Sequence, residues 1–125
     1  MEINRPEVVA EVIQCFLDYE KALTVNDVPA LTEAFWSSPE VSRFGIADRQ
    51  AGAAALAAWR AAQPPLPPGR RLFETVVTTF GADLATVTTL FDYPGSSARP
   101  GRQSQTWVRL PSGWRIVHAH VSHES

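Results

Sequence analysis

The sequence predicts one α+β domain, residues 1–125, in which three N-terminal helices pack on a curved, mainly antiparallel sheet. Two observations lead to this prediction. The first half of the chain shows three helix patterns interrupted by one short strand pattern. The second half shows four long segments rich in β-branched and aromatic residues. The length, with 45% hydrophobic and 19% charged residues, fits a single globular domain.

Three helices are expected in the first half. Residues 6–24 repeat apolar side chains at spacings of three and four, with Asn4 as the expected cap. A shorter helix follows a cap at Asn26 or Asp27. The alanine-rich residues 51–62 form the third, which the proline cluster QPPLPPG ends. The stripe of the first helix consists of Val8, Val9, Val12, Cys15, Phe16, Tyr19 and Leu23.

Five strands are expected. The stretch EVSRFGI alternates briefly and predicts a short strand between the second and third helices. RRLFETVVTTF and LATVTTLFDY, joined by GAD, predict a hairpin. After the long loop PGSSARPG, the stretch GRQSQTWVRLPSGWRIVHAHVS predicts two more strands joined by a Pro-Ser-Gly turn. The helices are expected to cover one face of the resulting sheet.

Composition excludes several classes of function. A net charge of −2 gives no electrostatic footprint for nucleic acid or an anionic membrane. No run approaches the length of a membrane span and the start does not resemble a signal peptide, so a cytoplasmic protein is expected. The single Cys15 excludes an internal disulfide. Lys21 is the only lysine among eleven basic residues, so an anion site would use guanidinium groups.

Tyr19 and Arg43 are the first candidate site residues. Tyr19 lies on the buried stripe of the first helix, and a buried hydroxyl needs a partner. That partner is either a backbone carbonyl in the core or a polar pocket. Arg43 lies in the short strand, where it is either solvated or, if buried, requires an anion.

The last strand carries a histidine pair. Simple alternation places His118 and His120 on one face, together with Trp114 and Ile116. Two imidazoles make an incomplete metal site, and His123 is out of alternation with them, so no metal is expected. The pair is interpreted either as satisfied histidines on a mixed face or, for His120, as a hydrogen-bond donor in a pocket.

The preceding strand is polar on both faces. Arg102, Ser104 and Thr106 share one face, and Gln103, Gln105 and Trp107 share the other. This strand either meets solvent or lines a pocket. The chain has no nucleophile elbow, phosphate loop or dinucleotide fingerprint, and one lysine leaves little room for a serine–lysine apparatus. Any chemistry must therefore use tyrosine, arginine, histidine and neutral donors.

Four segments carry a resemblance to a known family. FLDYEKAL, VSRFG, AWRAAQ and, above all, GRQSQTWVRLPSGWRIVHAHVS resemble the AtzH/HpxZ-type family of the NTF2-like (SnoaL-like) superfamily, over nearly the whole chain. The family is associated with cyanuric acid and oxalurate catabolism. The resemblance implies a cone-shaped pocket between helices and sheet, a homodimer through the sheet, and an amidase-signature enzyme as a partner in nitrogen catabolism.

The resemblance also implies site residues. A tyrosine and an arginine form the catalytic pair assigned within the family, and they correspond to Tyr19 and Arg43. The family tends to have a glutamate after the segment matching Phe44 and Gly45, where this chain offers Asp48 as a substitute.

Two functions follow from these observations. The favoured one is a metal-free amidohydrolase, without an organic cofactor, acting on a small carboxylated urea. Arg43 would bind the carboxylate, and Tyr19 would donate or shuttle a proton. The expected substrate-binding residues are Gln105, His120, Trp107 and Ser104. The alternative is a non-catalytic ligand-binding or accessory module for a partner amidase.

Overall fold

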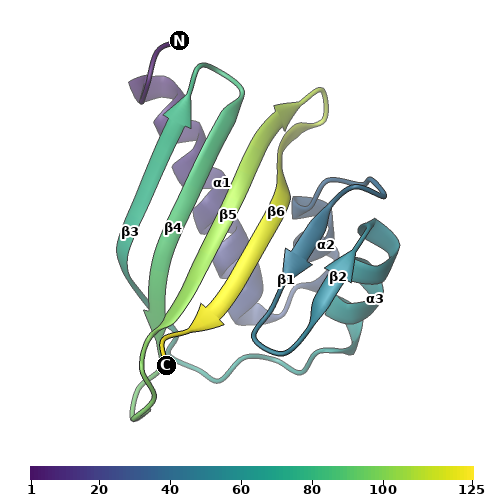
Figure 1. Cartoon of the computed structure of the whole chain (residues 1–125), viewed down its shortest axis with the longest axis vertical. Helices are drawn as coiled ribbons and strands as arrows, with labels where there is room; N and C mark the ends of the chain where they lie inside the picture. Colours follow the sequence, from purple (N-terminus) through teal and green to yellow (C-terminus); the bar gives the residue numbers. More distant parts are fainter.

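The computed structural model describes residues 1–125 as three helices on one six-stranded sheet (Figure 1). The strand order is β2-β1-β6-β5-β4-β3, and every neighbouring pair is antiparallel except β1 and β6. The predicted α+β architecture, with three helices on a mainly antiparallel sheet, is therefore confirmed. In chain order the elements are α1 (Pro6–Val25), α2 (Val28–Ala34), β1 (Ser42–Phe44), β2 (Arg49–Ala51), α3 (Ala53–Ala62), β3 (Arg71–Phe80), β4 (Leu84–Asp92), β5 (Gly101–Leu110) and β6 (Gly113–His123).

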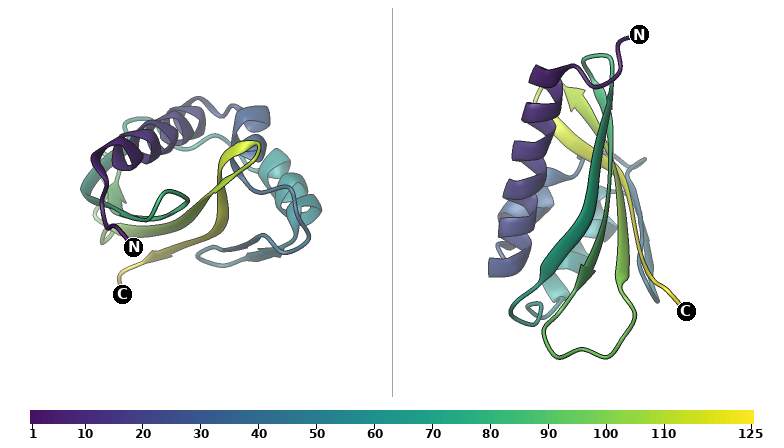
Figure 2. Two further views of the ribbon diagram at one scale, coloured as in Figure 1. Left: turned by 90° about the horizontal axis from the view of Figure 1, so that it is seen from above. Right: turned by 90° about the vertical axis from the view of Figure 1, so that its left-hand side faces the viewer.

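The sheet curves around α1, which lies along its concave face (Figure 2). The apolar stripe of α1 meets the inward-facing residues of β4, β5 and β6, and together they form one core. Inside this core Val12, Phe16, Val87, Trp107 and Ile116 are at most 2% exposed. The concave face thus packs against α1 in the core at one end of the sheet, and at the other end it can line a pocket.

The N-terminal caps of the first two helices agree with expectation at α2 and differ from it at α1. Asp27 caps α2 as predicted, because its carboxylate accepts a hydrogen bond from Ala30 N at 3.2 Å. Asn4 does not cap α1, whose N-cap residue is Arg5 without a side-chain bond. Instead, Asn4 Oδ1 accepts from Thr79 N at 2.8 Å, and Asn4 N donates to Thr79 O at 3.0 Å. The amide of Asn4 therefore fastens the N-terminus to β3.

Strand β2 was not expected from the sequence. It has only three residues, too few to reveal a period of two, and it pairs antiparallel with β1. In this pair Arg43 stands opposite Gln50. Because β1 also pairs with β6, in parallel, Arg43 stands next to Ala119 on its other side. The short strand therefore carries Arg43 into the sheet rather than leaving it in a loop.

A β-bulge interrupts the alternation of β6. Thr106 of β5 pairs with His118, but the next residue, Trp107, pairs with Ile116, so Val117 is an extra residue. Beyond the bulge Ala119 faces the concave side and is 4% exposed. The expectation that His118 and His120 share a face with Ile116 is therefore wrong, because one inserted residue exchanges the two faces.

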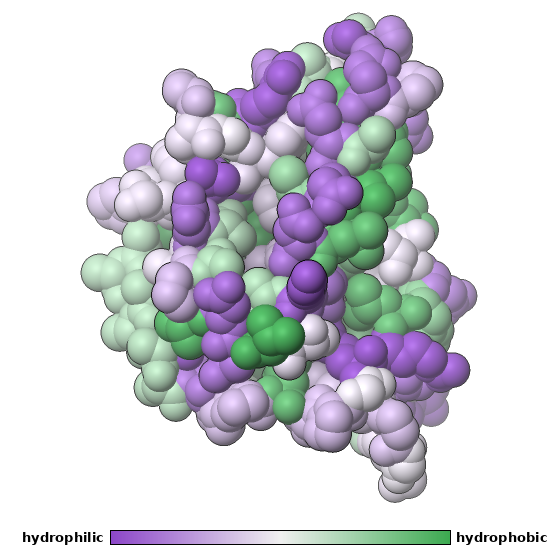
Figure 3. Space-filling view, turned by 180° about the vertical axis from the view of Figure 1, so that it is seen from behind, coloured by the Kyte–Doolittle hydropathy of each residue, from purple (hydrophilic) through white to green (hydrophobic).

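The helix-bearing face of the molecule mixes hydrophilic and hydrophobic residues (Figure 3). Two apolar residues of α1, Ile13 and Leu17, are 40% and 51% exposed there. No helix is long and apolar enough to cross a membrane.

Candidate functional site

A pocket of about 410 Å³ lies between the C-terminal half of α1, α3, the proline-rich loop and the concave face of the sheet. This volume suits a small molecule rather than a polymer. The loop side is apolar, whereas the sheet and helix sides carry polar and charged groups. The apolar residues of the loop side are Ile46, Pro64, Pro65, Leu66 and Pro67.

One row of residues crosses the floor of the pocket over three strands. Arg43 of β1 neighbours Ala119 of β6, and Ala119 neighbours Gln105 of β5. Since neighbouring strands lie about 4.8 Å apart, the backbones of Arg43 and Gln105 stand about 10 Å apart, with only a methyl group between them. The small side chain of Ala119 therefore leaves room for a ligand between two polar side chains.

This geometry predicts the effect of a larger residue at Ala119. In the variant Ala119→Leu, the added carbon atoms would occupy the space between Arg43 and Gln105, so we expect the KM for any substrate of this pocket to rise at least about tenfold. The measurement is a Michaelis–Menten series, or a direct binding titration where no turnover exists. Ala119→Gly, which adds no volume, is the matched control and should keep its ligand affinity within about threefold.

Arg43 is buried and already has partners. The residue is 9% exposed. Its Nη1 donates to Asp48 Oδ1 at 2.7 Å and to Gln50 Oε1 at 3.0 Å, and Gln50 Nε2 donates to Asp48 Oδ1 at 2.9 Å. Burial lowers the pKa of Arg43, and the hydrogen bond to Asp48 opposes that shift. The remaining donors, Nε and Nη2, have no partner within the chain and can bind a ligand.

Asp48 lies close enough to Arg43 for its carboxylate to accept a hydrogen bond from the guanidinium group. The turn after β1 closes with a bond from Gly45 N to Asp48 O at 2.8 Å. A Cβ atom on Gly45 would stand 2.5 Å from Asp48 Oδ1 and 2.7 Å from Arg43 Nη1. Hydrogen bonds from Gln50 and Arg43 lower the pKa of Asp48. The glycine thus allows a short aspartate to meet the arginine directly.

Tyr19 lines the pocket from the face of α1 that points away from solvent. It is 6% exposed, and the edge of its ring packs against Phe35 at a centroid distance of 6.1 Å. Its hydroxyl makes no hydrogen bond within the chain. Burial raises its pKa, against the opposing charges of Arg60 and Arg43. The phenol is therefore protonated at neutral pH and is available as a donor.

Gln105 and Trp107 act as a unit on the concave face. Trp107 Nε1 donates to Gln105 Oε1 at 2.9 Å, and both residues are buried. Because the amide oxygen is engaged, the amide nitrogen of Gln105 is the group left for the pocket. Gln105 therefore lines the pocket as predicted, whereas Trp107 lies behind it and orients it.

The other two predicted binding residues lie on the opposite face. Ser104 and His120 pair with each other across β5 and β6 and are exposed on the convex side of the sheet. His120 packs there against Phe44, at a ring-centroid distance of 5.6 Å. The bulge explains His120, and alternation from the inward-facing Gln105 explains Ser104. The structure does not bring either residue into the pocket.

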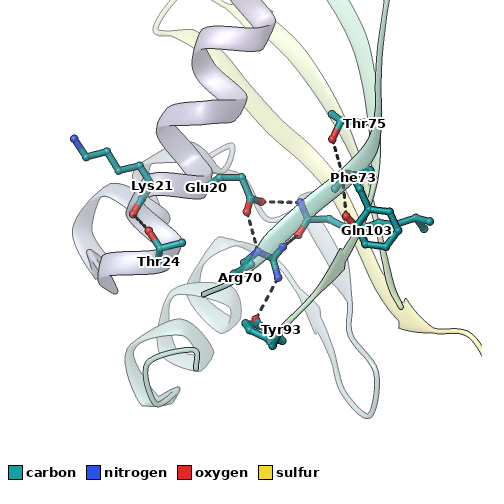
Figure 4. Close-up of polar contacts among 10 residues, drawn as sticks. Glu20, Lys21, Thr24, Arg70, Phe73, Thr75, Tyr93 and Gln103 are labelled. Carbon is teal, nitrogen blue, oxygen red and sulfur yellow. Dashed lines mark hydrogen bonds and ion pairs between the residues drawn. The ribbon is translucent and has the colours of Figure 1, made fainter. Parts of the chain in front are cut away.

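A closed polar network forms the wall opposite Arg43 (Figure 4). Glu20 of α1 accepts from Arg70 Nε at 2.9 Å and from Gln103 Nε2 at 3.0 Å. Arg70 Nη2 in turn donates to Gln103 Oε1 at 3.1 Å, and Nη1 donates to Tyr93 Oη at 3.3 Å. The side chains of Arg70 and Glu20 are 4% and 8% exposed. Their charges are matched within the chain.

Sequence reasoning missed Trp59 and Arg60 of α3, which also line the pocket. The guanidinium carbon of Arg43 lies 3.9 Å from the centroid of the Trp59 ring, and that of Arg60 lies 4.6 Å from it. A signal did exist: Arg60 follows Leu56 by four residues, which places it on the buried face of the helix.

A larger hollow, of about 600 Å³, lies between α2, α3 and the β5–β6 hairpin. Its charged residues, Glu33 and Arg115, face each other at 3.8 Å. The hollow therefore presents no unmatched charge and no buried donor without a partner, unlike the pocket at the concave face.

Comparisons with known proteins agree with this geometry. A family model described as AtzH-like matches residues 1–125. The crystal structure of a cystatin-like fold protein from Burkholderia xenovorans LB400 is 50% identical, has a TM-score of 0.95, and is matched over 100% of this chain and 98% of its own. A protein of unknown function from Pectobacterium atrosepticum SCRI1043 is 46% identical, with a TM-score of 0.94 and coverage of 98% and 95%.

A more distant comparison supports the fold alone. An NTF2-like protein of unknown function from Pseudomonas putida KT2440 is 18% identical, has a TM-score of 0.81, and is matched over 94% of this chain and 87% of its own. No curated protein matches the chain. The arrangement of three helices on a curved six-stranded sheet is thus an NTF2-like, or cystatin-like, α+β fold.

Proposed function

We propose, from the premise that this chain belongs to the AtzH-like family of NTF2-like proteins, that its pocket hydrolyses a C–N bond of a small carboxylated urea. The observation that carries the proposal is that three uncommitted hydrogen-bond donors line one pocket: the Tyr19 hydroxyl, the free guanidinium nitrogens of Arg43 and the Gln105 amide nitrogen. Such donors are suited to a planar, oxygen-rich anion.

In the proposed reaction a water molecule adds to the carbonyl carbon beside the leaving nitrogen. Negative charge then develops on the carbonyl oxygen, and a guanidinium donor of Arg43 stabilises it. The C–N bond breaks as Tyr19 donates its proton to the leaving nitrogen. The proton lost by the attacking water restores the phenol, so that one water is consumed and an acid and an amine are produced.

The pair formed by Arg43 and Asp48 has a positioning role in this proposal. Because Asp48 Oδ1 accepts from both Arg43 Nη1 and Gln50 Nε2, the guanidinium plane is held on one side while the other side faces the ligand. A preorganised donor costs no rearrangement as charge develops. Arg43 would therefore contact the reacting carbonyl through its free nitrogens.

The experiment is ammonia release by the purified protein over a panel of carboxylated ureas. The variant Arg43→Gln, purified in the same way from a host without the corresponding amidase, is the comparison. Activity in the native protein that this variant loses supports the proposal. Equal activity in both samples would point to a contaminating hydrolase and leave the accessory-module function, whose readout is comigration with an amidase on gel filtration.

We also propose that two copies associate through the convex face of the sheet. Phe44 is 45% exposed and packs on this face against the rings of His118 and His120, and exposed aromatic groups that lie together favour association. Sedimentation equilibrium should give about twice the chain mass of 13.7 kDa. The variant Phe44→Glu should shift the distribution toward monomer, and a native protein that sediments as a monomer would contradict the proposal.

A further inference from the structure

We infer that Arg60 is the principal anion-binding residue of this pocket and holds the carboxylate of the ligand. The inference deepens the proposed function, since it concerns the same pocket, but its test requires binding and no turnover. Arg60 lies on α3, four residues after Leu56, and both residues are buried on the same helix face.

Arg60 is a buried cation without a partner in the chain. The residue is 7% exposed, and its side chain makes no ion pair and no hydrogen bond. Its Nε is completely buried and has no acceptor. A buried charge that lacks a counter-ion is costly, so its presence indicates that a ligand supplies the anion.

The other two arginines of the pocket differ from Arg60. Arg70 shares a closed network with Glu20, and Arg43 is paired with Asp48 at 2.7 Å. Each of these two positive charges is therefore matched by one carboxylate. The positive charge of Arg60 is the one left unmatched. Electrostatics alone thus place a bound anion nearer to Arg60 than to Arg43 or Arg70.

Trp59 orients the guanidinium group of Arg60 without neutralising it. The guanidinium carbons of both Arg60 and Arg43 lie over its ring, at 4.6 and 3.9 Å from the centroid. Such cation–π contacts fix the plane of a guanidinium but leave its in-plane N–H groups free. A planar carboxylate can therefore approach Arg60 in the guanidinium plane and form two parallel hydrogen bonds.

Tyr19 connects this anion site with the proton donor. Burial raises the pKa of Tyr19, and Arg60 is the strongest of the charges that oppose the rise. An anion bound to Arg60 would offset that opposing charge and keep the phenol protonated. Ligand binding and proton donation would therefore be coupled through Arg60.

The test compares two small planar ligands by isothermal titration calorimetry on the purified native chain. Oxamate carries a carboxylate beside an amide, and oxamide is its uncharged counterpart. We expect the native protein to bind oxamate at least about tenfold more tightly than oxamide. Arg60→Gln should lose this preference, and Arg60→Lys should retain part of it. Arg109→Gln, which removes an exposed charge at the far end of β5, should retain all of it.

A stability measurement separates ligand binding from a structural role. If Arg60 serves the ligand, the free Arg60→Met protein should melt at the same or a higher temperature than the native protein, because an unmatched buried charge has been replaced by an apolar side chain of similar length. Oxamate should raise the melting temperature of the native protein and not that of Arg60→Met.

Three results would overturn the inference. They are an unchanged oxamate preference in Arg60→Gln, a large drop in the melting temperature of Arg60→Met, or no oxamate preference in the native protein. The proposed hydrolysis fails separately, through absence of ammonia release. A protein that binds oxamate through Arg60 but releases no ammonia would keep the anion site and refute the enzyme.

Discussion

Replacing Tyr19 with phenylalanine is expected to lower the turnover of a carboxylated urea by about 10²–10⁴-fold, the usual contribution of a positioned general acid. The fold should be retained, because the ring still packs against Phe35 and the hydroxyl makes no bond within the chain. The measurement is kcat for ammonia release, with circular dichroism to confirm folding. A variant with native kcat would exclude Tyr19 as the proton donor.

The matched control is Tyr93→Phe at the same pocket. Tyr93 Oη accepts a 3.3 Å hydrogen bond from Arg70. Removing this hydroxyl therefore disturbs the polar network in the pocket wall and leaves the proposed proton donor in place. We expect an effect of less than about tenfold on kcat, because the Tyr93 hydroxyl contacts Arg70 and no group that reacts in the proposed step. Equal losses in both variants would mean that the Tyr19 hydroxyl has no role beyond that of an ordinary hydroxyl in the pocket.

The pH dependence of kcat tests the same assignment. Because burial raises the pKa of Tyr19 above its ordinary value, the donor stays protonated through neutral pH. The alkaline fall in kcat should therefore lie above about pH 10, the value for an exposed tyrosine. The contribution of the buried phenol to the free energy of unfolding also falls at alkaline pH. It is complete below the unfolded-state pKa of Tyr19 and is lost as pH rises through its folded-state pKa.

Replacing Glu20 with glutamine should cause the largest loss of stability among single substitutions in the pocket wall. The carboxylate accepts from Arg70 at 2.9 Å and from Gln103 at 3.0 Å in a buried setting. Removing its charge leaves Arg70 buried and unmatched, so the free energy of unfolding should fall by about 3–5 kcal/mol. Urea denaturation gives the value.

The control and the rescue both alter ion pairs. Asp92→Asn breaks the exposed pair between Arg71 and Asp92, and should leave the unfolding midpoint unchanged. The double variant Glu20→Leu with Arg70→Met should recover part of the loss, since an apolar pair can replace a buried ion pair. A Glu20→Gln protein as stable as Asp92→Asn would show that solvent reaches the network.

The candidate residues that lie in the pocket differ in how strongly the sequence indicated their burial. Tyr19 belongs to a stripe of seven residues over about four turns, so its face was determined before any tertiary contact was known. Arg43 follows from strand alternation beside Val41, which is 1% exposed. The long helix pattern determined the buried face of Tyr19, whereas the brief alternation around Arg43 left its burial open until the sheet was known.

The residues predicted wrongly or missed depend on tertiary structure. His120 lies beyond a bulge that no pattern in GWRIVHAHVS reveals, since both faces of that stretch mix apolar and polar residues. Ser104 shares a strand whose two faces are both polar. Arg60 was missed because a cation in a helix is usually solvated. Only the arrangement of neighbouring acids shows that its charge has no partner.

The bulge at Val117 also bears on how this pocket could change by descent or by design. Deleting that one residue would restore strict alternation along β6 and leave Ala119 and Val121 facing the cavity, because the outward-facing His118 would then directly follow the inward-facing Ile116. Only a strand that keeps Val117 and pairs without the bulge would turn His118 and His120 inward. The strand can thus lose one codon at this position and still present the same side chains to the pocket.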